Sequence, residues 1–353
     1  MKKYKVVGMM SGTSLDGLDI AYCEFWKEYE NWEYRLIKAI TIPYDILLKE
    51  KLSSLENGTA FSIIEANIEF GRYLGRMANE FIQRNRLEVD LIASHGHTIF
   101  HRPEIGITYQ LGSGSHLLAE TGIQVVCNFR EGDVAMGGQG APLVPIGDML
   151  LFDNYDACLN LGGFSNVSFK DGQGIHAFDI SPANIAVNNL CGQVGLDFDD
   201  RGRMGMQGKV VDDLLQQLNA LAYYKQPFPK SLGKEWYMNS FKPCMDKAGK
   251  YNLEDLLRTV YEHISLQVAT VLNGFHLENI LVTGGGAFND FLMERIRGHT
   301  AGKIIVPSSD LVNYKEALVF AFLGVLRVRN EINILSAVTG SKHDSSGGTV
   351  YNF

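Results

Sequence analysis

Residues 11–19 bring together groups that can bind a phosphate. The segment reads SGTSLDGLD, and the apolar runs on both sides of it predict two strands joined at this point. Small residues at a hairpin tip let successive backbone N–H groups face an anion, so Gly12, Thr13 and Ser14 could hold phosphate oxygens. A carboxylate would repel phosphate, so Asp16 and Asp19 would hold hydrated Mg²⁺ or fix the turn. An ordinary Asp-Gly hairpin with incidental serines explains the same segment equally well.

Two other glycine turns follow predicted strands. NLGGFSN spans residues 160–166, and VTGGGAFND spans residues 282–290 and leads into a predicted helix. Bare backbone at a helix N-terminus can bind a phosphate or a flat ring, with Asn289 near the first helical turn. The second turn has neither the Gly-Lys-Ser/Thr of a Walker motif nor a full GxGxxG. Together, the turns are typical of a nucleotide site.

A histidine pair and an arginine precede a long glycine loop. His95 and His97 end a strand in SHGHTIFH and, by strand alternation, point the same way. They could ligate the metal of a hydrolase together with His176 and Asp179, or they could hydrogen-bond a polar substrate. Residues 128–145 then read NFREGDVAMGGQGAPLVP. A planar cation beside a glycine loop suits a polyol or a carboxylate, although a surface crossover between domains explains the loop as well.

The segment FDISPAN, residues 178–184, places Asp179 at the end of a strand. Open α/β sheets carry their chemistry at this edge, so Asp179 is a candidate general base. Pro182 stops the strand and could begin a helix. A structural, cap-like role for Asp179 remains an alternative.

The same order of elements occurs twice and would position these residues. Strands at 4–10, 18–26 and 34–43, a helix at about 60–86 and a strand at 89–94 predict a ribonuclease-H-like sheet. The second set has strands at 157–163, 165–170, 174–181 and 279–286, and helices at about 210–225 and 253–275. We therefore predict an α/β protein with two ribonuclease-H-like domains flanking a nucleotide cleft. The predicted domains are residues 1–147 and 148–353, with the last helix able to pack back on the first domain.

Composition excludes several classes of protein. A net charge of −8 argues against nucleic acid or an anionic membrane as the main partner. The 5 cysteines are scattered without a CxxC pair, so neither disulfides nor a zinc site is expected. The longest apolar run, residues 317–326, is far shorter than the ~18 residues of a membrane span. We predict a cytoplasmic protein.

These segments together resemble the anhydro-N-acetylmuramic acid kinases. The resemblance covers nearly the whole chain, through GMMSGTSLDGLD, SHGHTIFH, TGIQVVCNFREGDVAMGGQGAPLVP, LNLGGFSNVS, FDISPAN, LVTGGGAFND and EALVFAFLG. It implies the fold shared by actin, sugar kinases and heat-shock chaperone ATPases. It also implies that ATP phosphorylates O6 of a 1,6-anhydro sugar while water opens the anhydro bridge, as part of peptidoglycan recycling. A homodimer is expected as well.

The resemblance assigns roles to individual residues. It places ATP on Gly12, Thr13, Ser14, Leu15, Asp16, Gly17, Leu18 and Asp19, and on Gly284, Gly285 and Gly286. The pattern of glycine turns adds Gly162, Gly163 and Asn289 as predicted nucleotide contacts. Asp179 becomes the catalytic base, and Glu316 binds sugar or water or caps its helix. The sugar contacts that we predict are His95, His97, Arg130, Asp133, Gly138, Gln139 and Asn166. Asp16 and Asp19 would hold Mg²⁺ through ATP.

The chain also departs from the family pattern. Ile180 and Ser181 replace the usual Thr-Gly after the aspartate, residues 112–114 read GSG where Gly-Asp-Gly is common, and His97 replaces a glutamine. These differences concern the sugar side and leave open whether the sugar is free or carries a peptide. Two alternatives to the kinase therefore remain: a metal-dependent hydrolase using His95 and His97, and a catalytically silent sensor of ATP and sugar.

Overall fold

The chain forms two α/β units, each built on one sheet. The computed structural model describes residues 2–353, in which one unit extends to Leu151 and includes Tyr314–Phe353, and the other is Phe152–Asn313. The first boundary therefore lies four residues beyond the predicted one at 147. The C-terminal residues, assigned by the prediction to the second domain with a possible return of the last helix, belong to the first unit.

The first unit has a seven-stranded sheet in the order β12-β6-β4-β1-β2-β3, with β5 paired to β4. β1 is antiparallel to β2 and parallel to β4, which is the pattern predicted from the sequence. The strands are β1 (Tyr4–Ser11), β2 (Gly17–Glu28), β3 (Asn31–Pro43), β4 (Leu91–Arg102), β5 (Ile107–Leu111), β6 (Val125–Cys127) and β12 (Thr349–Tyr351). The helices are α1 (Ile46–Ser54), α2 (Ala60–Asn85), α3 (Gly114–Thr121), α4 (Glu131–Ala135), α5 (Pro145–Leu151), α13 (Ser309–Val328) and α14 (Ser336–Thr339). Helix α13 begins in the second unit, and its residues from Tyr314 onward belong to the first.

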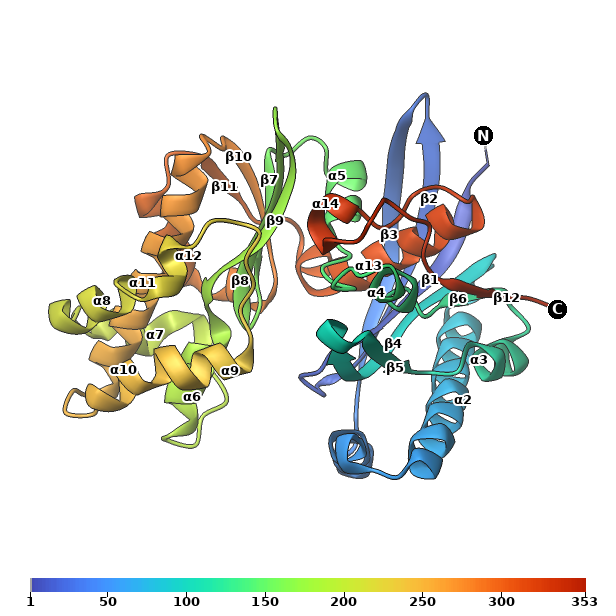
Figure 1. Ribbon diagram of the computed structural model, residues 1–353, viewed down its shortest axis with the longest axis horizontal. Coiled ribbons are helices and arrows are strands. Elements are labelled where there is room, and N and C mark those ends of the chain that lie inside the picture. The colour runs from blue at the N-terminus through green and yellow to red at the C-terminus, as the bar shows by residue number, and fades with distance from the viewer. Residues whose placement is uncertain (1) are drawn as a thin grey trace. The chain divides into compact units, whose positions relative to one another are not determined.

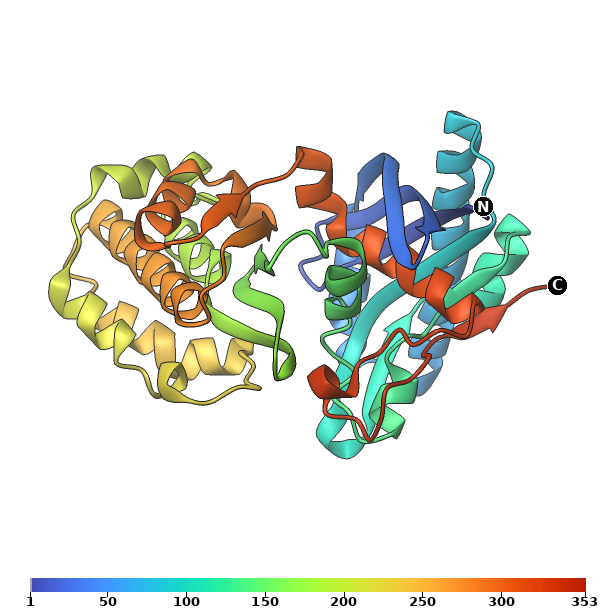
Figure 2. The same ribbon diagram turned by 90° about the horizontal axis from the view of Figure 1, so that it is seen from above.

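Helix α13 packs closely on the first sheet, and Figure 2 shows it running across the strands. Two glycines permit the approach. A Cβ on Gly8 would lie 2.0 Å from the Ala317 carbonyl oxygen, and one on Gly324 would lie 2.6 Å from Cβ of Ala93. This close packing explains why the C-terminal residues join the first unit. The opposite face of the sheet packs against apolar side chains of α2 and α3.

The second unit repeats this arrangement with five strands in the order β11-β10-β7-β8-β9. The strands are β7 (Ala157–Leu161), β8 (Phe164–Asp171), β9 (Gly174–Pro182), β10 (Asn279–Thr283) and β11 (Lys303–Ile305). The helices are α6 (Asn184–Gly192), α7 (Arg203–Gln207), α8 (Asp212–Asn219), α9 (Lys234–Trp236), α10 (Lys242–Lys247), α11 (Leu253–Gly274) and α12 (Asp290–His299). Both sheets thus have the strand order expected of a ribonuclease-H-like domain.

The helices of the second unit cover one face of its sheet (Figure 1). Leu159, Val167 and Phe178 point into the core between that face and α11, whose residues Leu257 and Val260 are fully buried. Neighbouring residues on the same strands point to the opposite face, because side chains alternate along a strand. In the described residues 2–353, no helix is both long and apolar enough to cross a membrane.

Candidate active site

The β1–β2 tip presents free backbone donors. Its conformation is fixed by a hydrogen bond of 3.2 Å from the Leu15 N–H to the Gly12 carbonyl, with Leu15 at a φ of 59°. Among residues 2–353, no acceptor receives the N–H groups of Gly12, Thr13 or Ser14. A Cβ on Gly12 would meet only the Ser14 hydroxyl, at 3.5 Å. The tip is therefore open and can donate several hydrogen bonds to an anion.

Carboxylates lie beside this tip. Asp19 Oδ1 accepts a hydrogen bond of 2.6 Å from the Thr41 hydroxyl. Burial raises the pKa of Asp19, and the neighbouring Asp16 carboxylate raises it further. Glu316 lies inside α13 and not at its start, so the alternative that it caps the helix is wrong. The residue as a whole is exposed, but desolvation of its carboxyl raises the carboxyl pKa. The Arg130 charge opposes that rise, and Asp19 adds to it. Among the described residues these carboxylates do not form a group of three metal ligands, so a hard cation here would also need oxygen ligands from the nucleotide.

Arg130 and His95 form one hydrogen-bonded unit. The Arg130 Nε donates to His95 Nε2 over 3.0 Å, and its Nη1 donates to the Gly140 carbonyl over 2.6 Å. Because His95 Nε2 accepts, its proton must sit on Nδ1, which lies 3.0 Å from the Gly96 carbonyl. Burial and the Arg130 charge hold the pKa of His95 well below its usual range. His95 is therefore neutral, and both of its ring nitrogens are hydrogen-bonded to protein groups. Its role is to orient the Arg130 guanidinium.

This arrangement removes the geometric basis for the alternative hydrolase. A histidine whose two nitrogens bond to protein groups has no lone pair left for a metal. In the part of the chain that the structure describes, no group of three or more His, Cys, Asp and Glu side chains is placed to bind a metal ion. His95 and His97 lie within β4 and not at a strand end as predicted. The prediction that they point the same way is also wrong: the His95 ring packs on Phe320 of α13, and the His97 ring packs on Phe70 of α2, on the opposite face of the sheet. Gly96 between them has a φ of 74°, which breaks the strand alternation.

His97 belongs to a buried chain of polar groups that ends at Tyr44. The Tyr44 hydroxyl donates to Ser11 Oγ over 2.7 Å, and Ser11 Oγ lies 3.0 Å from His97 Nδ1. All three side chains are buried, and burial lowers the pKa of His97. His97 Nε2 has no partner among the described residues, so it remains available to a ligand. No sequence pattern indicated Tyr44, which follows β3 and reaches Ser11 only because the sheet forms.

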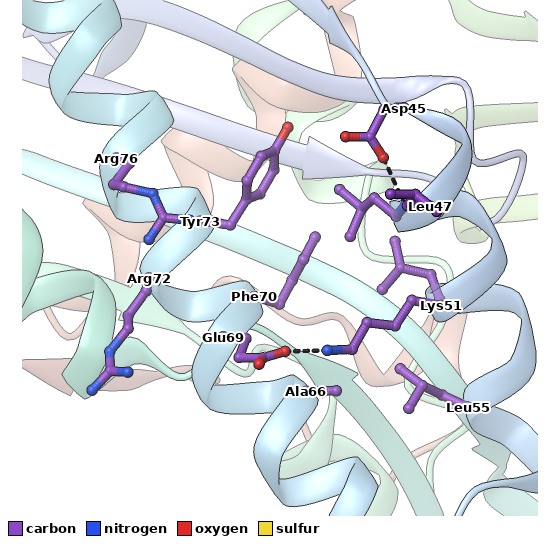
Figure 3. A pocket seen from close by; sticks show the side chains of 12 residues that line it. Asp45, Leu47, Lys51, Leu55, Ala66, Glu69, Phe70, Arg72, Tyr73 and Arg76 are labelled. Atoms are coloured by element: carbon purple, nitrogen blue, oxygen red, sulfur yellow. Dashed lines mark hydrogen bonds and ion pairs between the residues drawn. The ribbon is translucent and has the colours of Figure 1, made fainter.

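A pocket of about 490 Å³, which the sequence did not predict, lies between α1 and α2 (Figure 3). Phe70 and Tyr73 of α2 form part of its wall, and Lys51 of α1 pairs with Glu69 of α2. The Phe70 ring also meets the His97 ring edge-on, with the ring centres 6.2 Å apart. The pocket contains none of the predicted site residues.

Asp133 supports the glycine loop from inside the protein. Its side chain is fully buried, with Oδ1 accepting from the Thr339 hydroxyl and Oδ2 accepting from the Gly140 N–H, each over 2.7 Å. A Cβ on Gly138 would lie 2.2 Å from Asp133 Oδ2, so this glycine permits the close approach. We predicted that Asp133 and Gly138 contact the sugar, but this geometry favours positioning roles for both. Gln139 is exposed at the same loop and remains a candidate contact.

Backbone hydrogen bonds hold the Gly162–Gly163 turn of the second unit. The Gly162 carbonyl accepts from the Asn184 N–H, and the Gly163 carbonyl accepts from the N–H groups of Ala183 and Ile185, over 2.9–3.1 Å. The turn is thereby fixed to the start of α6. The N–H groups of the two glycines donate to no described acceptor and stay available.

The third glycine turn lies against the end of β7. Gly284 has a φ of +84°, and a Cβ there would lie 2.5 Å from Asn160 Oδ1. Asn289 caps α12, since its Oδ1 accepts from the Leu292 N–H over 2.9 Å and its Nδ2 donates to the Tyr261 hydroxyl over 2.8 Å. The Asn289 side chain is therefore engaged within the protein, which favours a capping role over the predicted nucleotide contact.

Four polar residues form a row across the second sheet. Strand register pairs Thr283 with Asn160, Asn160 with Asn166, and Asn166 with Asp179. Directly paired residues point to the same face, and alternation places this row opposite the helix-covered core. We predicted Asn166 and Asp179 as site residues and missed Asn160 and Thr283. The sequence predicted the strands but not their pairing, and without the pairing the row could not be recognised.

A bulge in β9 aims Asp179 onto this face. The register shifts between Ser165 and Asn166, so that Ile180 is the extra residue. Ile180 turns into the core, and Ser181, fully buried, donates its N–H to Ser165 Oγ over 3.1 Å. The two residues that depart from the family pattern therefore face the interior and leave the Asp179 carboxylate unobstructed.

Asp179 combines partial burial with one aligned hydrogen bond. The Leu232 N–H donates to Asp179 Oδ2 over 2.8 Å, while Oδ1 receives no hydrogen bond from the described residues. Burial raises the pKa of Asp179 to about 6, against the effect of the Leu232 bond, which lowers it. A carboxylate with this pKa is ionised at neutral pH and basic enough to accept a proton.

Comparison with known proteins decides the family. The family model described as anhydro-N-acetylmuramic acid kinase matches residues 4–353. The chain belongs to this family. Relatives bearing that name include one from Sulfurovum sp., which is 32% identical over 99% of this chain and 100% of its own length. Another, from Francisella tularensis subsp. novicida, is 33% identical over 97% of both chains.

Solved structures also resemble this anhydro-N-acetylmuramic acid kinase family member. One is component A of the (R)-2-hydroxyglutaryl-CoA dehydratase of Acidaminococcus fermentans, with 11% identity, a TM-score of 0.49, and coverage of 92% of this chain and 99% of that one. Another is the ROK hexokinase of Thermus thermophilus, with 12% identity, a TM-score of 0.42, and coverage of 92% and 100%.

Family membership establishes the activity as an anhydro-N-acetylmuramic acid kinase, a sugar kinase that uses ATP. Neither alternative from the sequence, the hydrolase or the silent sensor, receives support from these comparisons.

Proposed function

We propose that this kinase couples two reactions at one sugar: water opens the 1,6-anhydro bridge, and ATP phosphorylates the O6 that is released. The products are N-acetylmuramic acid 6-phosphate and ADP, which places the enzyme in the recycling of cell-wall sugar. The observation that carries this proposal is the Asp179 carboxylate, which is ionised at neutral pH and has Oδ1 free.

In the proposed step, Asp179 Oδ1 takes a proton from a water molecule. The water oxygen forms a bond to C1 from the face opposite O6, and the C1–O6 bond breaks, as in an inverting glycosidase. The electron pair left on O6 forms the new bond to the γ-phosphorus as ADP leaves. The phosphoryl group thus replaces the general acid that a glycosidase would need.

The phosphates have two candidate sets of donors. The N–H groups of Gly12, Thr13 and Ser14 in the first unit, and those of Gly162 and Gly163 in the second, donate to no described acceptor. Asp16 and Asp19 are the residues that would hold Mg²⁺ through the nucleotide, because both present carboxylate oxygens beside the first of these turns. The metal would offset negative charge on the transferring phosphoryl group.

The sugar has candidate partners in His97, Arg130, Gln139 and Asn166. His97 offers a free Nε2, Arg130 is held by His95 and Gly140, and Asn166 pairs with Asp179 across the sheet. Arg130 remains cationic at neutral pH, since burial lowers its pKa only to about 10. It could therefore pair with the lactyl carboxylate of the sugar. Glu316 is a further candidate contact to sugar or water.

We also propose a cytoplasmic homodimer, which follows from the resemblance to the family. The cysteines are scattered along the sequence without a CxxC pair, which supports a reducing compartment. Light scattering coupled to size exclusion tests the dimer directly, and a monomer at micromolar concentration would contradict it.

The reaction in ¹⁸O-labelled water tests the coupled mechanism. We expect the label at C1 of the sugar product and none in its phosphate, because water attacks carbon and O6 takes the phosphoryl group. Mass spectrometry of the sugar before and after enzymatic removal of the phosphate locates the label. Exchange of the free anomeric oxygen is controlled by incubating unlabelled product in labelled water for the same time. Label in the phosphate would contradict the mechanism.

A further inference from the structure

The segment 223–232 holds Asp179 at three of its atoms. The Tyr223 hydroxyl donates to the Asp179 carbonyl over 2.7 Å, and the Asp179 N–H donates to the Lys230 carbonyl over 3.2 Å. The Leu232 N–H then donates to Oδ2 over 2.8 Å. The same segment therefore fixes the backbone of Asp179 on both sides and one of its two carboxylate oxygens.

The segment is itself braced. The Lys230 ammonium donates to the Tyr223 carbonyl over 3.2 Å and lies 4.7 Å from the centre of the Tyr223 ring. The Phe228 ring stacks on that of Phe178, the residue before Asp179, with ring centres 5.3 Å apart and an angle of 11°. The Tyr223 ring also packs against Trp236, with centres 5.3 Å apart. These contacts place the Leu232 amide relative to β9.

We propose that residues 223–232, here called the aspartate clamp, position Asp179 so that Oδ1 alone faces the reacting water. The proposal rests on the proposed function, because it assumes that Asp179 is the base. Leu232 and Tyr223 are positioning residues: the Leu232 amide binds the charged carboxylate and so favours the ionised form. Without that bond, the carboxylate could rotate about its Cβ–Cγ bond, and its affinity for a proton would rise.

Several titratable groups lie on the elements that surround Asp179. Within the clamp they are the Tyr223 hydroxyl, whose pKa burial raises above its ordinary range, and the Lys230 ammonium, whose pKa burial lowers. On β9 itself, His176 points to the other face and pairs with Asp171 of β8. On α11, Glu262 pairs with Arg295, and His263, which burial keeps neutral, bonds to Tyr224. The hydrogen bond from the Leu232 amide is thus the main interaction that opposes the rise of the Asp179 pKa caused by burial.

The sharpest test replaces one backbone N–H by an ester oxygen. Leucic acid at position 232 deletes the donor to Oδ2 and keeps the side chain. We expect the acid limb of the pH profile of kcat/KM, centred near pH 6 in the wild type, to move up by about one pH unit. At pH 8.5, where the carboxylate is ionised in both proteins, the remaining loss of kcat should be less than tenfold.

The matched control is an ester at position 233, because the Gly233 N–H donates to no acceptor in the described chain and the Leu232 carbonyl, which becomes the ester carbonyl, accepts from no described donor. Its acid limb should stay in place. An unmoved limb in the 232 ester, or equal movement in both esters, would overturn the clamp. Asp179→Asn separates this failure from failure of the proposed function: if that variant turns over near normally, Asp179 is not the base. If it is inactive while the 232 ester behaves as wild type, only the clamp is wrong.

Tyr223→Phe gives a second test that needs no ester. It deletes the bond to the Asp179 carbonyl and keeps the ring, so kcat should fall about two- to tenfold while KM for both substrates is unchanged. Tyr224→Phe is its control, since the Tyr224 hydroxyl bonds to His263, over 2.8 Å, and not to Asp179. The control should lower the melting temperature without lowering kcat. An unchanged kcat in Tyr223→Phe, or an equal loss in both variants, would overturn the proposal.

Discussion

The first hairpin of each unit occupies the same place in its sheet, yet the two tips are built differently. The β1–β2 tip is five residues long, carries hydroxyls and a carboxylate, and a Cβ on Gly12 would touch only Ser14 within 4 Å. The β7–β8 tip has two residues, and its carbonyls accept the first N–H groups of α6. The first tip can adapt to a ligand, whereas the second is held by the fold.

Glycine turns in the same topology can therefore have different roles: one can bind a ligand, and another can allow close packing of the backbone. Both tips leave backbone N–H groups without an acceptor among the described residues. In the second unit, the glycine turn at Gly284 also packs directly on the backbone of β7. Substitutions in the first unit's tip should therefore change nucleotide affinity, and substitutions at the second unit's packed turn should change stability. Asp179, which we propose as the base, lies in the second unit.

The largest effect is expected from Asp179→Asn, because the amide cannot accept a proton at neutral pH. Base catalysis contributes about 10²–10⁴-fold, so kcat should fall by at least that order while the affinities for ATP and sugar persist. Coupled ADP-release kinetics and calorimetry provide the two measurements. Asp171→Asn, at the far end of the same strand pair and bonded to His176, is the control and should keep kcat within about twofold.

Gly12→Val should weaken ATP binding by about 10–100-fold, because the side chain obstructs backbone donors that would bind charged phosphate oxygens. The fold should be unaffected, since the position is open. Isothermal titration with a non-hydrolysable ATP analogue measures the affinity. Gly172→Val, in the β8–β9 turn where a Cβ also meets nothing within 4 Å, is the matched control. Equal affinity in the two variants would remove the β1–β2 tip from the nucleotide site.

Gly284→Ala should act on stability. Its φ of +84° is unfavourable for alanine, and the new Cβ would lie 2.8 Å from the Leu161 carbonyl carbon, which cannot move without shifting β7. We expect a loss of about 1–3 kcal/mol in the free energy of unfolding. Gly163→Ala, where a Cβ meets nothing within 4 Å, should change it by less than about 0.5 kcal/mol. Denaturant titrations measure the free energy of unfolding of both variants. Equal losses would contradict the distinction between packed and open glycines.

The smallest effect expected is a gain in stability for Asp179→Asn. The native pKa of Asp179 is raised from 3.8 to about 6, so between these values the folded state binds more protons than the unfolded state. Stability therefore falls as pH rises through this window, and the penalty is fully present above it. Removing the charge should stabilise the protein by about 1–2 kcal/mol at pH 7 and by almost nothing at pH 4. Unfolding titrations at both pH values check the difference, and a variant that is less stable at pH 7 would contradict it.

Much of the fold could be predicted because its signals are local. Apolar runs and the glycine turns that separate them located β1, β2, β7, β8 and β10 to within a few residues. The repeated order of elements then predicted both sheets. The domain limits were less predictable, because α13 packs on β1 through Gly8, a contact between residues about 300 positions apart that no pattern of neighbours reveals.

The sequence alone determined the family, the free hairpin tip at Gly12, and Asp179 as a residue at the end of a strand. Tertiary structure decided which polar residues are free to act. Asp133 is occupied by Thr339, Asn289 is occupied by Tyr261, and Asp179 keeps one free oxygen because Leu232, 53 residues away, binds the other. A residue's type sets which hydrogen bonds it can make, but the partners that satisfy them come from distant strands and loops. Only folding, which brings those partners within about 3 Å, separates a supporting carboxylate from a reactive one.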